Sequence, residues 1–128
     1  MTKLKKTIIQ TYNDTIDEIL DYIALCDLMI ACSAEPTTYA EATGTYDLAD
    51  VAMASGDFAI ANDTNGRKVT MAAKSAVTID HSGAATHIAL CKSGDSTLRY
   101  VTTCTSQALT AGGTVDFPAW KINVTDPS

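Results

Sequence analysis

The sequence predicts a mainly β domain, a small sandwich or open barrel of about seven strands with an N-terminal α-helix. From Phe58 to Val124, short runs of alternating apolar and polar residues are separated by Gly, Asn, Asp and Ser turns. Before this region, apolar residues from Ile9 to Ile23 recur at helical spacing. We therefore expect one domain over residues 1–128, with a helical arm at 1–25 and a β domain at 27–128.

The helical arm has one apolar stripe and an acidic opposite face. Thr15 and Glu18 fit a capping box, which predicts that a helix begins near Asn13 or Asp14. We expect its second half to pack on the β domain and the segment Leu4–Tyr12 to reach outward. The predicted stripe consists of Ile9, Tyr12, Ile16, Ile19 and Ile23, widened by Leu20.

The first part of the β domain predicts a strand, a helical turn and an ambiguous segment. Residues 27–33 alternate, so Leu28, Ile30 and Cys32 are expected on one face. Residues 37–42 contain a second capping-box pattern, which predicts a short helical turn. Residues 46–54 alternate weakly and fit either a strand or a covering loop.

The rest of the domain predicts two hairpins followed by an interrupted final strand. Residues 58–61 and 69–71 flank Asp63-Thr64-Asn65-Gly66, and Asn-Gly is typical of a tight hairpin. Residues 86–91 and 97–103 form a second hairpin through residues 92–95. Pro118 cannot donate to a neighbouring strand, so the strand that contains Trp120 is expected to be bent or to lie at an edge.

The charge balance argues against electrostatic binding of nucleic acid. The net charge is −6 and the pI about 4.6, whereas nucleic-acid binding needs clustered Lys and Arg. The one basic cluster is Lys3, Lys5 and Lys6, which fits either a solvated tail or an arm that contacts an acidic partner. Neither a signal peptide nor a membrane span is expected from the apolar runs.

The four cysteines predict neither a metal site nor a disulfide. Cys26, Cys32, Cys91 and Cys104 form no Cys-x-x-Cys pair, and the chain has two histidines. The predicted hairpin places Cys91 opposite a residue near Leu98, too far from Cys104 for a bond. We expect free, mostly buried thiols and no cofactor.

Three short patterns resemble functional sites but fit structural roles better. Residues 80–82 read Asp-His-Ser, yet neighbouring strand residues point to opposite faces, so His81 is expected in a turn. His87 shares a predicted strand face with Cys91, without two further metal ligands. A calcium loop that starts at Asp63 would need Glu at its twelfth position, which is Lys74.

Five stretches of the sequence point together to a known group of proteins: residues 31–42, 65–70, 83–90, 109–115 and 117–122. Together they resemble a group of small virion structural proteins of tailed bacteriophages. The resemblance spans nearly the whole chain after about residue 20, and its stretches carry no catalytic motif. It implies a virion component that is made in the host cytoplasm, and it leaves open a capsid, neck or tail position.

These observations lead to an expected function as a capsid decoration, or cement, protein that stabilises the phage head. The expected partners are the major capsid protein and further copies of the chain, with no nucleic acid or membrane. The alternatives are a neck or tail component, such as a collar or fibre base, and an outward-facing receptor- or carbohydrate-binding module. An enzyme is not expected. The candidate contact residues are Lys3, Leu4, Lys5, Lys6, Ile8, Ile9, Tyr12 and Trp120.

Overall fold

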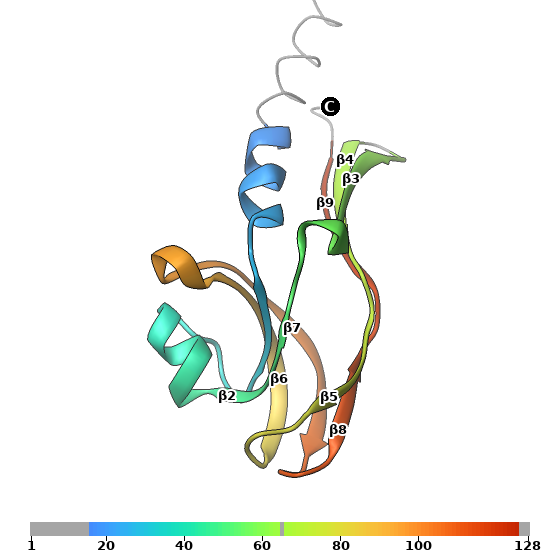
Figure 1. Ribbon diagram of the computed structural model, residues 1–128. Helices are drawn as coiled ribbons and strands as arrows, with labels where there is room; N and C mark the ends of the chain where they lie inside the picture. Colours follow the sequence, from blue (N-terminus) through green and yellow to red (C-terminus); the bar gives the residue numbers. More distant parts are fainter. Residues whose placement is uncertain (1–15, 65, 126–128) are drawn as a thin grey trace, which may run out of the picture.

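A computed structural model describes residues 16–64 and 66–125, and these form a mainly β domain with an N-terminal helix. The strands lie in two facing layers that do not close into a barrel within the described residues (Figure 1). The predicted fold class is confirmed, with nine strands in the described part. They are β1 (Leu28–Cys32), β2 (Asp47–Ala52), β3 (Phe58–Asp63), β4 (Gly66–Met71), β5 (Lys74–Thr78), β6 (Gly83–Lys92), β7 (Thr97–Leu109), β8 (Thr114–Phe117) and β9 (Trp120–Thr125).

The first layer is a four-stranded antiparallel sheet in the order β2-β1-β6-β7. The predicted hairpin between β6 and β7 is present, and a 3₁₀ turn (η3, Ser93–Asp95) connects its strands. Cys91 lies opposite Leu98, as the sequence predicted. In this hairpin three residues, 104–106, stand opposite Thr86 between the pairs Ala85↔Gln107 and His87↔Thr103, an irregularity that bends a strand.

The second layer consists of the sheet β3-β4-β9 and the pair β5-β8. The hairpin β3-β4 places Asp63 opposite Gly66, which confirms the predicted tight turn. After β8, the chain passes Pro118 and continues as β9, which pairs with β4 instead of β5. Pro118 therefore marks the change of partner strand, and β9 lies at the edge of its sheet in the described residues, as predicted.

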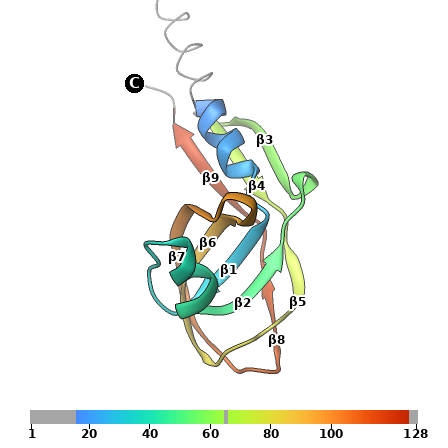
Figure 2. The same ribbon diagram turned by 60° about the vertical axis from the view of Figure 1, so that its left-hand side comes forward.

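The N-terminal helix occupies residues 16–24 of the described part and packs beside the second layer (Figure 2). Ile16, Leu20 and Ile23 are buried, so this half of the helix packs on its own domain, as predicted. Ile19 was wrongly placed in the stripe, because its side chain is 52% exposed. The predicted cap at Thr15 and the stripe residues before it lie outside the described residues.

Two apolar clusters cover the two faces of β1. Met29 and Ala31 belong to the main core between the layers, together with residues such as Leu90 and Met71. The alternate residues, Leu28, Ile30 and Cys32, face a smaller cluster on the outer side, which confirms the predicted alternation.

A short helical segment covers the smaller cluster. It ends in a π-helical turn (η1, Glu41–Thr45), later in the chain than the predicted turn. The hydroxyl of Thr38 accepts a hydrogen bond from the Glu41 backbone N–H at 3.1 Å. The Glu41 carboxylate accepts from the backbone N–H of Thr37 at 2.8 Å, one residue earlier than a capping box requires. Ala42, which belongs to this segment, is buried in the smaller cluster.

Candidate functional site

The described residues contain one group of carboxylates with metal-ligand spacing, Asp47, Asp50 and Asp80. One oxygen of each lies within 4.8 Å of the others. Asp47 and Asp50 belong to β2, and Asp80 follows β5. Sequence reasoning did not bring these residues together, because residues three apart on a regular strand point to opposite faces.

A β-bulge in β2 explains how Asp47 and Asp50 reach the same side. Ala31 pairs with Ala49, but the next residue of β1, Cys32, pairs with Asp47, so Leu48 is an extra residue. An extra residue shifts the alternation of side chains by one position. The bulge therefore turns Asp47 toward the side of Asp50.

Asp47 is the buried member of this group. It is 7% exposed, and its Oδ1 accepts no hydrogen bond from any described residue. Burial, followed by the neighbouring Asp50 and Asp80 carboxyls, raises the pKa of Asp47 to about 8. Asp50 and Asp80 are exposed, so the group opens to the surface.

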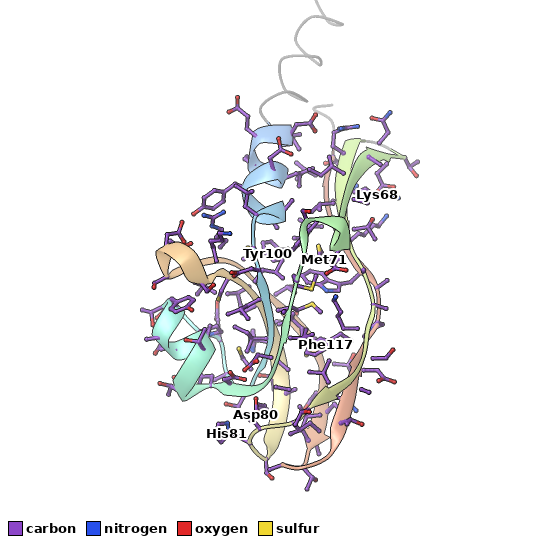
Figure 3. The ribbon with its side chains drawn as sticks, viewed as in Figure 1. Lys68, Met71, Asp80, His81, Tyr100 and Phe117 are labelled. Carbon is purple, nitrogen blue, oxygen red and sulfur yellow. The ribbon has the colours of Figure 1, made fainter. Side chains whose placement is uncertain are left out.

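The segment that carries Asp80 is fixed to β2 through its backbone. The N–H groups of Asp80 and His81 both donate to the Leu48 carbonyl, at 2.7 and 3.1 Å. Ile79 forms a β-bridge with Ala49 directly before this point. Figure 3 shows Asp80 and His81 adjacent at this turn. The positions of the carboxylates thus follow from backbone pairing between the two layers.

The run Asp80-His81-Ser82 does not converge into a catalytic triad. The Nδ1 of His81 lies 2.9 Å from the Asp47 carbonyl oxygen, which can only accept, so this nitrogen carries the proton in that contact. The hydroxyl of Ser82 accepts from the backbone N–H of Ala111. His81 lies at a bend, as predicted, and both side chains fix turns.

His87 and the cysteines also have structural surroundings. His87 lies on β6, and its Nδ1 is 2.9 Å from the Thr86 hydroxyl. All four cysteines are free, which agrees with the sequence prediction. Burial raises the pKa of the Cys32 and Cys91 thiols to about 12 and that of Cys26 to about 11, so these thiols are unreactive at neutral pH.

The second candidate site is an apolar groove of about 370 Å³ between β7 and the segment from β8 to β9. Phe117, which Figure 3 places between the two layers, and Trp120 line it on one side. Cys104 and Gln107 line it from β7. Asp116 is the charged residue of its lining.

Trp120 is the single predicted contact residue that the structure places at a candidate site. Its indole N–H donates to the Met29 sulfur at 3.4 Å, and its ring centroid is 6.1 Å from that of Tyr100. Part of the ring is buried and part faces the groove. The other predicted contact residues, Lys3 to Tyr12, lie outside the described residues.

No family model matches the chain, and no curated protein or solved structure matches it at a significant level. In the described part of the chain, helices long and apolar enough to cross a membrane are absent.

Proposed function

We propose that the protein is a structural accessory component of a tailed-bacteriophage particle, a decoration protein present in many copies on the capsid. Its proposed partners are the major capsid protein and other copies of this chain. The resemblance to small phage virion proteins motivates the assignment, and it rests on residues 31–42, 65–70, 83–90, 109–115 and 117–122. The observation that carries it is the apolar groove beside β7, which offers a surface for contact between copies.

The β7 wall of this groove lacks the usual protection of a sheet edge. In the described residues no strand pairs with the outer side of β7. Residues 103 and 105–108 are exposed, and the run Val101–Leu109 contains neither charge nor proline. Natural edge strands are commonly blocked by lysine, proline or a covering element. As protection, the described part of β7 has only the bulge at residues 104–106. The rest of the strand is unprotected, so an extended segment can pair alongside it.

We propose that the occupant is the N-terminal segment of a second copy, residues 1–12. This segment carries Leu4, Ile8 and Ile9, which suit an apolar groove, and three of the nine Lys and Arg residues of the chain. The remaining residues carry six basic and fifteen acidic side chains, so the body attracts a basic segment. Twelve extended residues reach roughly 40 Å, enough to bridge neighbouring subunits.

A lattice explains why such a modest contact would suffice. Copies that each bind the shell and one another gain affinity through repetition, without large individual interfaces. The groove alone is at the small end of ligand-sized pockets. Decoration of a repeating surface is therefore a better fit than a tight one-to-one complex.

The self-association test compares the full chain with residues 13–128 by sedimentation velocity and by alkylation of Cys104. Cys104 lines the groove and is half-buried, whereas Cys26, Cys32 and Cys91 are buried and serve as internal controls. We expect the full chain to self-associate with Cys104 protected, and the truncated chain to be monomeric with Cys104 reactive. Equal association by both proteins, or Cys104 equally reactive in both, would overturn the role of the segment.

The role in the particle is tested separately by quantitative mass spectrometry of purified phage. A decoration protein is expected in on the order of hundreds of copies, and a neck or tail protein in about six or twelve. Absence from purified particles would rule out the proposed function, whatever the groove binds.

A further inference from the structure

We propose that Asp47, Asp50 and Asp80 bind a calcium ion that joins β2 to the segment following β5. The first ground is their spacing. Calcium is coordinated by oxygens at roughly 2.3–2.6 Å, so two ligands on opposite sides of one ion lie about 5 Å apart. The three carboxylate oxygens lie within 4.8 Å of one another, which is the separation that a shared ion requires.

The second ground is the buried oxygen of Asp47. Its Oδ1 accepts no hydrogen bond from the described residues, although the residue is 7% exposed. A buried polar atom without a partner is costly, and native proteins rarely leave one. The Asp47 carboxyl faces two further carboxyl groups, those of Asp50 and Asp80, and their oxygens are acceptors. A cation between them satisfies all three.

The third ground is that the positions of these residues do not depend on the ion. The bulge at Leu48 sets the direction of Asp47, and the Leu48 carbonyl holds the backbone of Asp80 and His81. Because the backbone is already in place, less conformational freedom is lost when the side chains bind a ligand. None of the four ion pairs among the described residues uses these aspartates, so no described cation competes for them.

The ligand chemistry selects calcium. All three side chains offer hard carboxylate oxygens. The Nδ1 of the nearby His81 contacts the Asp47 carbonyl, so this nitrogen is not free to bind a metal. Zinc prefers nitrogen and sulfur ligands. Magnesium demands a near-ideal octahedron and keeps most of its water, whereas calcium accepts irregular oxygen sets completed by water, as the exposed Asp50 and Asp80 allow.

The location gives the ion a structural role. β2 belongs to the four-stranded sheet, and β5 belongs to the opposite layer. Between them the described residues form one β-bridge, Ala49↔Ile79, with the hydrogen bonds to Leu48 beside it. An ion held by β2 and Asp80 therefore ties the two layers together at this border.

The test is a calorimetric titration of calcium chloride into the chelator-treated full chain, together with thermal unfolding. We expect about one ion per chain and a rise in Tm of about 5–15 °C at a hundredfold excess over Kd. Asp80→Asn and Asp50→Asn change exposed residues, so the fold should persist while the calcium response is lost. Glu35→Gln, which removes an exposed charge elsewhere, should keep the full response.

Two results would overturn the site. One is the absence of binding heat and of a Tm shift in the wild-type chain. The other is a shift that survives in Asp80→Asn, or that magnesium reproduces at equal concentration, because either would indicate general screening of a chain with net charge −6. Circular dichroism of each variant shows whether a lost response reflects a lost fold. Because the site lies apart from the groove, its failure would leave the proposed particle role untouched.

Discussion

The guanidinium of Arg99 lies 3.9 Å from the centroid of the Tyr22 ring, so the N-terminal helix is tied to the hairpin β6-β7. The same group donates to the Tyr22 carbonyl at 2.7 Å and to the Asp95 carboxylate at 2.8 Å. Its side chain is 6% exposed. Arg99 on β7 thus connects the N-terminal helix, through Tyr22, with the turn η3, through Asp95.

Arg99→Lys should lower the free energy of unfolding by about 1–3 kcal/mol, because an ammonium cannot stack on the ring while donating in two directions. Urea denaturation followed by circular dichroism measures this change. Lys68→Gln is the control, since Lys68 forms none of the described ion pairs, and it should change stability by less than about 0.5 kcal/mol. Equal stability of Arg99→Lys and wild type would contradict the stacking role.

Leu20 and Ile19 are adjacent but should respond oppositely to truncation. Leu20 is fully buried, so Leu20→Ala should cost about 2–5 kcal/mol through lost contacts and a cavity. Ile19 is 52% exposed, so Ile19→Ala should cost less than about 0.5 kcal/mol. Thermal and urea unfolding of both variants provide the comparison, and similar losses would mean that the helix packs with a different face.

Asp63 should give the protein an acid-sensitive stability. Its carboxylate accepts hydrogen bonds from Lys121 at 2.8 Å and from Asn123, both on β9. The Lys121 hydrogen bond, followed by the backbone N–H of Thr64, lowers the pKa of Asp63 from 3.8 to about 2. Between these values the unfolded chain binds more protons than the native one, so this contribution is present above pH 3.8 and is lost as the pH falls to about 2.

Tm measured across this acid range in wild type and Asp63→Asn tests the effect. The wild-type curve should fall more steeply toward low pH than that of the variant, which has no carboxyl to protonate at this position. Asp21→Asn, on the exposed face of the helix, is the matched control and should keep the wild-type slope. Parallel curves for wild type and Asp63→Asn would contradict the assignment.

Ala76 occupies a left-handed backbone conformation with φ 55°, at the irregularity in β5 between Lys74 and Val77. A Cβ atom in this conformation costs roughly 1–2 kcal/mol, whereas glycine adopts it freely. Ala76→Gly should therefore stabilise the protein by about 0.5–1 kcal/mol after the entropy cost of glycine. Chemical denaturation measures the gain. Ala84→Gly, in the regularly paired start of β6, should instead destabilise, and a loss of stability in both variants would show that strain at Ala76 is negligible.

The features that the sequence predicted correctly depend on short-range signals. The turn between Asp63 and Gly66, the hairpin through Ser93–Asp95 and the interruption at Pro118 each follow from a few adjacent residues. The face assignment of β1 followed from simple alternation, because that strand pairs with β6 without a register shift from Leu28 to Cys32.

The acidic group could not be predicted in the same way. Its geometry depends on the bulge at Leu48, which inverts the alternation, and on the approach of Asp80 from the other layer. Ile19 was misplaced for a related reason. Helical spacing predicts a broad apolar stripe, and the element packed against the helix decides which residues at the border of that stripe are buried. The groove likewise arises where β8 and β9 change partners.

The pairing of β9 with β4 has a consequence for biosynthesis. The two strands pair from Gly66↔Thr125 to Met71↔Trp120, so the partners are about fifty to sixty residues apart along the chain. Contacts between residues so distant in sequence form slowly, because the chain must lose the entropy of closing a long loop before the contacts stabilise the structure. While a ribosome still holds residues 114–125, the partner side of β4 is uncovered, with Val69 and Met71 lacking Ile122 and Trp120. The second layer therefore forms completely only after β9 has left the ribosome. Until then the uncovered side of β4 exposes the nascent chain to aggregation.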